Sequence, residues 1–358
     1  MAGKELGVAI IGAGRMGTLR ANLVKEYPST QFVGIGDVTA EPAEKLGAQV
    51  KADLVTTDVD ALIHDPRVNA VIVSTPEGLH RDAVIKSLKA GKSVLVEKPI
   101  AITLEDADEM IRVSEETGSS LHVGYTRRYR DCFLRTKEQI LQGRLGRIYS
   151  LHTRVYNARG QMLAILNRDP HATPVIDILT YYIDLVTWFM PDNPPVSVVA
   201  RGKMGIFEKA GHDAHDVTWA ILTMRDGAVI NMGVCYSLPL NYPALGQSDR
   251  FEIVGEDGVL MLDDDHTDHM LYTEKGIPHP YLSDRTVNFA FLGGHSAGDW
   301  AVGSFWGGMT NETRSWLDHL TFGRKIPSTT PREARRTLEV TLAIEEAAHT
   351  GKEVLLGN

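Results

Sequence analysis

A glycine-rich turn directly after a short apolar segment is the feature that most constrains the fold of this chain. The apolar segment is Val8–Ile11, and the turn that follows reads Gly12-Ala13-Gly14-Arg15-Met16-Gly17. This spacing between a strand and a helix is typical of a dinucleotide-binding βαβ unit, because glycines let the backbone turn tightly and approach a pyrophosphate. Free N–H groups at the helix amino terminus then bind that anion. The predicted nucleotide contacts are Gly12, Gly14, Arg15, Met16 and Gly17.

A carboxylate stands where the ribose of the nucleotide is expected. Asp37 ends the apolar segment Phe32–Gly36 and lies 20 residues after Gly17. A carboxylate at this spacing accepts hydrogen bonds from the ribose hydroxyls of NAD. It would repel the 2′-phosphate of NADP, and the three residues that follow supply no cation. We therefore expect NAD, with NADP less favoured; a solvated aspartate in a turn is the alternative interpretation.

The order of apolar and amphipathic segments predicts two domains in an α/β protein. Alternating βαβ patterns over residues 1–124 favour a doubly wound parallel sheet, a Rossmann domain. In residues 125–358, Asp226-Gly227 and Asp257-Gly258 each separate two strand candidates, as in tight hairpins. We expect this second domain to be α+β with a mostly antiparallel open sheet, to serve substrate binding and oligomerisation, and to include a C-terminal helix from Thr330 that packs back on the first. The parallel strands are expected at Leu6–Ile11, Gln31–Gly36, Asn69–Ser74, Ser93–Glu97 and Ser120–Gly124.

Composition excludes several functional classes. The 358 residues carry a formal net charge of -9 and no long basic run, so we expect neither nucleic-acid nor membrane binding. No apolar stretch reaches ~18 residues, and the amino terminus lacks a cleavable signal pattern. The two cysteines form no CxxC pair, which favours a cytoplasmic protein without a disulfide framework.

A lysine at the end of a buried strand is the leading catalytic candidate. Glu97-Lys98-Pro99 closes the apolar segment Ser93–Val96, and α/β sheets bind ligands at the carboxyl ends of their strands. Oxidation of an alcohol by hydride transfer requires a group that accepts the hydroxyl proton. Burial and a cationic nicotinamide would both disfavour the lysine ammonium, so Lys98 is suited to that task. The alternative is a structural lysine paired with Glu97 or with a helix end.

With the glycine turn, Asp37, the segment Ser74–His80 and Glu97-Lys98-Pro99 in this order, the chain resembles the Gfo/Idh/MocA oxidoreductases, named for glucose–fructose oxidoreductase and inositol dehydrogenase. The resemblance covers essentially the whole chain, including the helix candidate Asp177–Leu185. Members of this family are commonly dimers or tetramers, so it implies a homodimer or homotetramer. It also implies that a set of residues lies beside the nicotinamide half of the cofactor: Ser74, Thr75, Pro76 and His80, bordered by Glu97 and Lys98.

The second catalytic group departs from the family pattern. The family has an Asp-x-x-x-His helix, and the matching positions here are Asp177 and Tyr181. Residues four apart share a helical face, so both are expected to point at Lys98 and a substrate hydroxyl. Either Tyr181 shares the proton with Lys98 while Asp177 orients the substrate, or Lys98 acts alone and Tyr181 shapes the pocket. Tyr181 as an ordinary core residue is a further alternative.

Two more groups of residues are weaker candidates. Arg154 and Tyr156 alternate on one strand candidate and are predicted substrate contacts if their side faces the cleft rather than solvent. Two clusters, His212–Asp216 and Asp263–His269, are rich in histidine and aspartate. Neither matches a closed zinc spacing, and such residues are common in turns, so no metal is expected.

These observations predict an NAD-dependent oxidoreductase. Its expected reaction interconverts a secondary alcohol and a ketone on a sugar, cyclitol or related polyhydroxylated small molecule, with Lys98, Asp177 and Tyr181 in the catalytic site. Three alternatives stay open: NAD-dependent cleavage of a glycosidic bond through transient oxidation, reduction of a dihydrodiol or imine, and a non-catalytic NAD-binding regulator. The missing histidine keeps the last of these open.

Overall fold

The chain folds into two compact units. The structure, a computed structural model, describes residues 3–240, 242, 247–263, 270–279, 284–292 and 298–357. The first unit comprises Met1–Arg130 and Trp300–Leu338, and the second comprises Asp131–Asp299 and Glu339–Asn358. The predicted boundary at residue 124 lies close to the first division. The segment from 300 to 338 differs from the expectation, since it belongs to the first unit.

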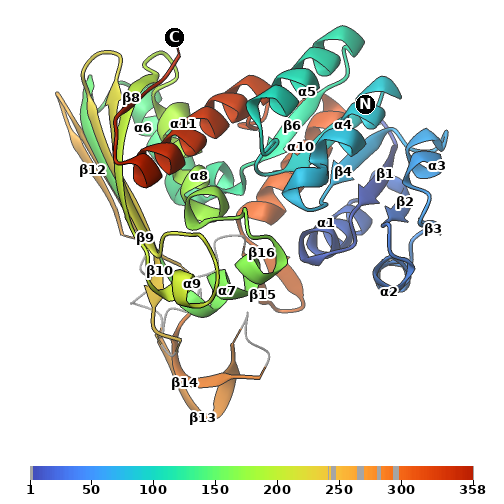
Figure 1. Cartoon of the computed structure of the whole chain (residues 1–358). Helices are drawn as coiled ribbons and strands as arrows, with labels where there is room; N and C mark the ends of the chain where they lie inside the picture. Colours follow the sequence, from blue (N-terminus) through green and yellow to red (C-terminus); the bar gives the residue numbers. More distant parts are fainter. Residues whose placement is uncertain are drawn as a thin grey trace. The chain divides into compact units, whose positions relative to one another are not determined.

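A six-stranded parallel sheet forms the centre of the first unit (Figure 1). Its strand order is β3-β2-β1-β4-β5-β6, and every neighbouring pair is parallel. This order, which reverses beside β1, is the doubly wound arrangement and confirms the predicted Rossmann fold. The elements are β1 (Leu6–Ile11), α1 (Arg15–Lys25), β2 (Thr30–Gly36), α2 (Ala40–Val50), β3 (Leu54–Thr56), α3 (Val59–His64), β4 (Ala70–Val73), η1 (Glu77–Leu79), α4 (His80–Lys89), β5 (Ser93–Glu97), α5 (Leu104–Thr117), β6 (Leu121–Gly124) and η2 (Thr126–Tyr129).

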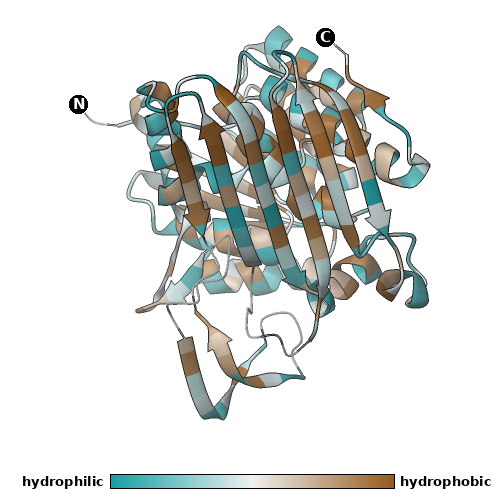
Figure 2. Cartoon of the chain, turned by 90° about the vertical axis from the view of Figure 1, so that its left-hand side faces the viewer, coloured by the Kyte–Doolittle hydropathy of each residue, from teal (hydrophilic) through white to brown (hydrophobic). Residues whose placement is uncertain are grey.

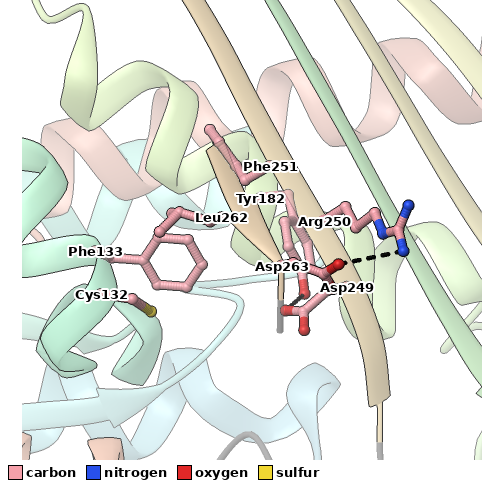
Figure 3. A pocket seen from close by; sticks show the side chains of 8 residues that line it. All are labelled: Cys132, Phe133, Tyr182, Asp249, Arg250, Phe251, Leu262 and Asp263. Carbon is pink, nitrogen blue, oxygen red and sulfur yellow. Dashed lines mark hydrogen bonds and ion pairs between the residues drawn. The ribbon is translucent and has the colours of Figure 1, made fainter. Parts of the chain in front are cut away.

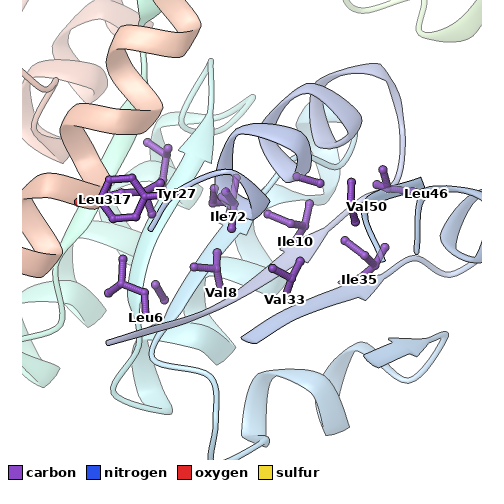
Figure 4. Packing of buried hydrophobic residues seen from close by; sticks show 14 of the residues in the cluster. Leu6, Val8, Ile10, Tyr27, Val33, Ile35, Leu46, Val50, Ile72 and Leu317 are labelled. Atoms are coloured by element: carbon purple, nitrogen blue, oxygen red, sulfur yellow. The ribbon is translucent and has the colours of Figure 1, made fainter. Parts of the chain in front are cut away.

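The core of this unit explains why residues after 300 belong to it. Alternate residues of the central strands, such as Val8, Ile10 and Ile72, pack beneath α1 and α2 (Figure 4). Helix α10 (Gly308–Phe322) adds Trp316 and Leu317 to the same cluster, and both side chains are buried. Burying large apolar side chains contributes roughly 1.5–3 kcal/mol each. The short strands β15 (Asp299–Ala301) and β16 (Ser304–Trp306) precede α10.

A seven-stranded sheet forms the centre of the second unit. Its order is β12-β11-β7-β10-β9-β8-β17, and within it the neighbours β7 and β10 are parallel while the other pairs are antiparallel. This confirms the predicted mostly antiparallel sheet. The elements are α6 (Asp131–Leu141), β7 (Ile148–Ala158), α7 (Arg159–Arg168), the π-helical turn η3 (Val175–Leu179), α8 (Thr180–Phe189), β8 (Pro195–Lys203), α9 (Ile206–Lys209), β9 (Val217–Met224), β10 (Val229–Leu238), β11 (Gln247–Gly255), β12 (Val259–Asp263), β13 (Met270–Pro278), β14 (Thr286–Phe291) and β17 (Val354–Leu355).

The two faces of this sheet differ. Residues at alternate positions of β7, such as Leu151 and Val155, are buried against the helices of the unit, whereas His152 between them is partly exposed. Figure 2 looks onto the other face, where strands alternate between apolar and polar residues without a covering helix. Val199 and Ile221 are 38% and 44% exposed there. The second unit therefore has one covered and one open sheet face.

Turn and cap residues act as the sequence predicts. Asp226-Gly227 connects β9 to β10, and Asp257-Gly258 connects β11 to β12. Helix α11 (Pro331–Thr350) begins with a capping box, in which Glu333 Oε2 accepts from Thr330 N at 2.8 Å and Thr330 Oγ1 accepts from Glu333 N at 3.3 Å. Among the described helices, none is long and apolar enough to cross a bilayer.

Candidate active site

Four neighbouring strands of the first unit end at one edge of the sheet. In the order β2, β1, β4 and β5, they are followed by Asp37, the glycine turn, Ser74-Thr75 and Lys98. Because parallel strands present their carboxyl ends together, these predicted site residues gather along one line of the sheet edge. The reversal of strand order beside β1 marks this edge as the place where a doubly wound sheet binds its ligand.

Each of the three glycines of the turn has a different structural role. Gly12 has a φ of +99°, and a Cβ on it would lie 2.6 Å from the Ser74 carbonyl oxygen. A Cβ on Gly17 would lie 1.9 Å from the Gly12 carbonyl oxygen, so helix and turn pack as closely as only glycine allows. A Cβ on Gly14 would meet no described atom within 4 Å. The backbone at Gly14 is therefore open to the approach of a pyrophosphate.

The amino terminus of α1 fits an anion. Its N-cap is Gly14, which provides no side-chain cap for the first N–H groups of the helix. A helix end with such N–H groups and a favourable dipole binds phosphate. Arg15 and Met16, the first two helical residues, bring their amides to that end. The glycine turn thus has the shape and the donors that the pyrophosphate of NAD requires.

Asp37 lies beside the glycine turn. Its Oδ2 accepts from Ala13 N at 2.8 Å and its Oδ1 accepts from Thr39 N at 2.9 Å. A carboxylate oxygen has two lone pairs, so each oxygen retains acceptor capacity for a hydroxyl group. The side chain is thereby fixed next to the cofactor turn, as the ribose interpretation requires.

Two hydroxyl groups at the end of β4 are buried without a hydrogen-bond partner among the described residues. Ser74 Oγ and Thr75 Oγ1 are buried and make no hydrogen bond with the described part of the chain. Buried polar groups are normally paired, since leaving one unpaired costs about 1–3 kcal/mol. Their position on the line of predicted cofactor residues fits a polar group of the cofactor, and Pro76 follows them at the start of η1.

His80, which is predicted to lie beside the nicotinamide half of the cofactor, holds two loops of the first unit together. Its ring is fully buried, with Nδ1 2.9 Å from the Pro99 carbonyl oxygen and Nε2 3.1 Å from that of Thr75. Burial lowers the pKa of His80 in spite of these two acceptors. Both ring nitrogens face main-chain oxygens, so His80 connects the loop after β4 to the loop after β5. It is a positioning residue for Thr75 and Pro99.

Lys98 lies on a turn that is supported from inside the unit. It follows Glu97, the last residue of β5, and its peptide bond to Pro99 is cis. The Glu97 side chain is almost fully buried, and its Oε1 accepts from Arg20 Nε at 2.8 Å. Glu97 is held by Arg20 and so positions the turn that carries Lys98, which is itself partly exposed.

Arg20 joins three elements of the first unit. Beyond Glu97, it donates to Glu312 Oε2 at 2.5 Å and to Thr313 Oγ1 at 2.7 Å, both on α10. Burial opposes the guanidinium charge, but Glu97 and Glu312 outweigh it, and the pKa of Arg20 is raised. A buried charge requires such partners, because desolvation of an unpaired ion costs several kcal/mol.

The second unit brings Asp177 to a tyrosine that sequence reasoning missed. Tyr236, on the covered face of β10, donates to Asp177 Oδ2 at 2.5 Å, and Gln161 Nε2 lies 3.4 Å from the same hydroxyl. Asp177 belongs to η3, and single π-helical turns are frequent at functional sites. Tyr181, one turn later on α8, is 9% exposed.

A second tyrosine–aspartate pair also connects a helix to the sheet, but here the tyrosine lies on the helix and the aspartate on the strand. Tyr182 on α8 donates to Asp249 on β11, so a helix tyrosine meets a strand aspartate here. These two residues border a small cavity of about 50 Å³ that Phe133 and Phe251 also line (Figure 3). Its volume holds a few waters at most, since one water occupies ~10–15 Å³ by this measure. We assign this cavity to packing rather than to the substrate.

Asn157 is a buried amide without a partner. It is fully buried on β7, and neither Oδ1 nor Nδ2 makes a hydrogen bond with the described residues. Tyr156 on β7 pairs with Cys235 on β10. Asn157 is the next residue on β7, and Tyr236 is the next residue on β10. By strand alternation Asn157 and Tyr236 therefore share the covered face on neighbouring strands. Asn157 thus lies on the strand next to Tyr236, the partner of Asp177, and on the same face of the sheet.

Arg154 and Tyr156 lie on the opposite face from that group. They alternate with the buried Val155 and Asn157, so the period of two places them on the open face. Arg154 Nη1 donates to Ser248 Oγ at 2.6 Å, and its guanidinium lies 4.5 Å from the Tyr156 ring centroid. The structure does not bring this pair together with Asp177, and we do not retain them as substrate contacts.

The two clusters rich in histidine and aspartate lie in different surroundings. In the first, Asp216 accepts from the amides of Ile206 and Phe207 at 2.7 and 2.9 Å and so caps α9, while His212 contacts Asn167 at 3.1 Å. Of the second, residues 264–269 lie outside the described residues. Asp263 pairs with Arg250 at 3.2 Å.

Fold and site together define a class of protein. A doubly wound sheet with a glycine turn, an acidic residue and a lysine at one edge, joined to a mostly antiparallel unit, is the arrangement of an NAD-binding oxidoreductase. Residues 6–125 match a family described as oxidoreductase family, NAD-binding Rossmann fold, and residues 137–356 match the C-terminal alpha/beta domain of the same family. The chain belongs to the Gfo/Idh/MocA oxidoreductase family. The predictions of family, enzyme class and cofactor are confirmed.

Relatives of known name include several dehydrogenases. The chain is 27% identical over 268 residues to myo-inositol 2-dehydrogenase from Thermotoga maritima, covering 72% of this chain and 75% of that protein. It is 33% identical over 243 residues to 2,7-anhydro-N-acetylneuraminate hydratase from Mediterraneibacter gnavus, covering 67% and 64%. The fold is similar to that of scyllo-inositol dehydrogenase from Lactobacillus casei with bound NAD(H) and scyllo-inositol, with a TM-score of 0.80, 20% identity, and coverage of 98% and 99%.

Proposed function

We propose that this protein is an NAD-dependent oxidoreductase that interconverts a secondary alcohol and a ketone on a cyclitol, sugar or related polyhydroxylated small molecule. The observation that carries the substrate class is the buried, unpartnered amide of Asn157 on the same sheet face as the Tyr236–Asp177 pair. A polyhydroxylated ring offers several donors and acceptors to such a group. Inositol dehydrogenases among the relatives favour the same class.

In this proposal the first unit holds the cofactor. The pyrophosphate lies against the open backbone at Gly14 and the start of α1, and Asp37 accepts from the ribose hydroxyls. Ser74 and Thr75 hydrogen-bond polar groups of the nicotinamide half. Bound NAD supplies the hydride acceptor.

Lys98 is the proposed proton-transfer residue. Its Nζ accepts the proton of the substrate hydroxyl during oxidation and returns it during reduction. Support comes from its place at the carboxyl end of β5, on a turn held by the Arg20–Glu97 pair and by His80. Rigid support of this kind matters because a misplaced acid–base group loses much of its effect.

Asp177 is proposed to orient the substrate through a second hydroxyl. Its side chain, held by the hydrogen bond from Tyr236, has further acceptor capacity for a substrate hydroxyl. For Tyr181 we retain the first of the two interpretations, a proton shared with Lys98. Tyrosine has a reference pKa of ~10, and nearby positive charge lowers it.

A second candidate function is a redox-neutral one. The relative named as a hydratase of a 2,7-anhydro sugar acid is 33% identical over 243 residues, which favours a reaction with no net change in the cofactor. In such a reaction the same proton-transfer residue would serve transient oxidation and re-reduction of the substrate. Net reduction of NAD distinguishes the two candidates.

We also propose a homodimer or homotetramer, with the open sheet face as the contact. Val199, Ile221 and Val254 are exposed on it by 38%, 44% and 41%. Apolar residues at this exposure on an uncovered sheet favour self-association. Sedimentation equilibrium of the purified protein measures the subunit number, and a monomer at all concentrations would contradict the proposal.

The experiment that tests the function is a substrate screen. Cyclitols, sugars, dihydrodiols and anhydro sugars are incubated with NAD and separately with NADP, with nicotinamide absorbance and product mass both recorded. The proposal expects NAD reduction with a cyclitol or sugar. Product formation without net NADH would favour the redox-neutral candidate, and NAD binding without any product would favour a non-catalytic regulator.

A further inference from the structure

Three side chains that could hold a metal ion meet in the second unit. His215 lies in the loop before β9, and Glu345 and His349 lie on α11. One potential ligand atom from each residue lies within 4.8 Å of the others. Glu345 and His349 are four residues apart, so they share one helical face. None of these residues belongs to the group around Asp177 and Tyr236.

The ring nitrogens of His215 are open to a ligand. The side chain is 8% exposed, yet within the described residues it makes no hydrogen bond that would satisfy its ring nitrogens. Its ring centroid lies 4.6 Å from that of His349 in an edge-on arrangement. Its ring nitrogens reach solvent rather than lying in a sealed cavity, so an ion can approach them. His215 therefore has a nitrogen lone pair available for a ligand.

His349 and Glu345 are held as metal ligands usually are. His349 Nδ1 donates to the main-chain oxygen of Glu345 at 2.9 Å, which places the ring proton on Nδ1 and a lone pair on Nε2. Glu345 Oε1 accepts from the hydroxyl of Thr173. Metal-bound histidines commonly donate their other N–H to a carbonyl, and metal-bound carboxylates commonly accept a further hydrogen bond.

We propose that His215, Glu345 and His349 bind a divalent transition-metal ion such as Zn²⁺. Two imidazoles and a carboxylate are a ligand set that suits zinc, with metal–ligand distances of about 2.0–2.2 Å. Ligand atoms around a tetrahedral ion lie roughly 3.3 Å apart, so ligand atoms that lie up to 4.8 Å apart must approach one another by up to ~1.5 Å on binding. Asp213, which is exposed, acts electrostatically on both His215 and Glu345 and adds to the attraction for a cation.

The bound ion would join two segments of the second unit. It would connect the loop before β9 to the last turn of α11, which are distant in sequence. The effect is a structural one: metal binding stabilises the folded unit by the free energy of binding. Sequence spacing alone hides the site, because only His215 belongs to the His212–Asp216 cluster and its partners follow more than 100 residues later.

The test uses the full-length chain without an affinity tag, dialysed against EDTA and then against buffer. Zn²⁺ alone is titrated by calorimetry, and Co²⁺ alone is followed by visible absorption, for the wild type and for His215→Ala and His349→Ala. The matched controls are His212→Ala in the same loop and Glu346→Gln on an exposed position of α11. Thermal unfolding in EDTA and in Zn²⁺ verifies that each variant folds.

The proposal expects one ion per wild-type chain and in both controls, with a Co²⁺ spectrum of a four- or five-coordinate ion. Loss of a ligand is expected to weaken binding by about 100-fold or more, beyond the effect of losing a supporting residue. The wild type and controls should also unfold at a higher temperature in Zn²⁺ than in EDTA, and His349→Ala should not. Zn²⁺ binding that is absent in the wild type, or unchanged in His349→Ala, would overturn the proposal.

Discussion

Arg20 donates from Nε to Glu97 Oε1 at 2.8 Å, with both side chains almost entirely removed from solvent. Glu97 immediately precedes Lys98, so the position of the lysine turn depends on a guanidinium that reaches it from α1. The same guanidinium bonds Glu312 on α10, which explains why the chain returns to the first unit after residue 300. The proposed catalytic lysine is supported by a buried ionic network that reaches it through its sequence neighbour Glu97.

Removing Arg20 should destabilise the first unit strongly. Arg20→Met leaves Glu97 and Glu312 buried without their cation, and breaking a buried ion pair costs ~3–5 kcal/mol of unfolding free energy. Arg112→Ala is the matched control, because its partner Glu116 is exposed and such a pair contributes ~0.5 kcal/mol. Urea unfolding measures both. Similar small losses in the two variants would contradict a structural role for the network.

Asp37 should determine the choice of cofactor. Asp37→Ala removes the predicted acceptor for the ribose hydroxyls and the charge that repels a 2′-phosphate. Hydrogen bonds to charged groups contribute ~1.5–3 kcal/mol, so NAD affinity should fall roughly 10- to 100-fold while NADP affinity is retained or rises.

The control for this variant is Asp58→Ala. Asp58 caps α3 by accepting from Ala61 N at 2.9 Å and has no predicted cofactor contact. Fluorescence titration with each nucleotide reports affinity. An unchanged ratio of NAD to NADP affinity in Asp37→Ala would show that the carboxylate serves only the glycine turn.

Tyr236→Phe should impair the substrate site more than the fold. It removes the hydroxyl that donates to Asp177, so Asp177 loses its fixed orientation, and kcat/KM should fall by ~10-fold or more. Tyr182→Phe removes the corresponding bond to Asp249 and should cost ~1 kcal/mol of stability with a smaller change in kcat/KM. Steady-state kinetics with the substrate from the screen compare the two variants. Equal kinetic losses would argue against a special role for the Asp177 pair.

Acid should weaken the first unit through His122. Burial, together with the nearby His319, lowers the pKa of His122 to about 4, and its Nδ1 lies 2.9 Å from Ser328 Oγ. The unfolded chain binds a proton near pH ~6.5, so between that pH and ~4 the unfolded state carries more protons, and stability falls as pH falls. The loss attributable to this group is roughly 2–4 kcal/mol.

Urea unfolding of the wild type and of His122→Asn across pH 4 to 7 measures that contribution. The variant retains a hydrogen-bonding side chain at position 122 but has no titrating group there, so its stability should depend less steeply on pH in this window. Parallel curves for the two proteins would show that other groups cause the acid dependence.

The strands of the first unit could be predicted from the sequence because each is an apolar run bounded by turn residues. The predicted Ser93–Glu97 matches β5 in full, and Ser120–Gly124 differs from β6 by one residue. The edge strand β3 was missed, since its three residues are half-buried and too short for a pattern. The helix candidate Asp177–Leu185 falls partly in the π-helical turn η3 and partly in α8, a change of backbone pitch that side-chain periodicity does not reveal.

The candidate site could be predicted only where its residues follow strand ends. Gly12, Asp37 and Lys98 have that signal, because the carboxyl edge of a parallel sheet is readable from the order of elements. Arg20 and Glu312 lie 292 residues apart, and their pairing depends on tertiary structure. Tyr236 had a local signal, since it continues the buried alternation of Met232 and Val234, but its contact with Asp177 requires the packing of η3 on the sheet.

The central claim concerns Lys98, and the kinetics of Lys98→Ala test it most directly. With the substrate identified by the screen, turnover and NAD affinity are measured for this variant and for Lys89→Ala, an exposed lysine at the end of α4. The account predicts that Lys98→Ala binds NAD as the wild type does and loses ~10²- to 10⁴-fold in kcat, while Lys89→Ala keeps normal turnover. A kcat for Lys98→Ala close to that of the wild type would contradict the assignment of Lys98 as the proton-transfer residue.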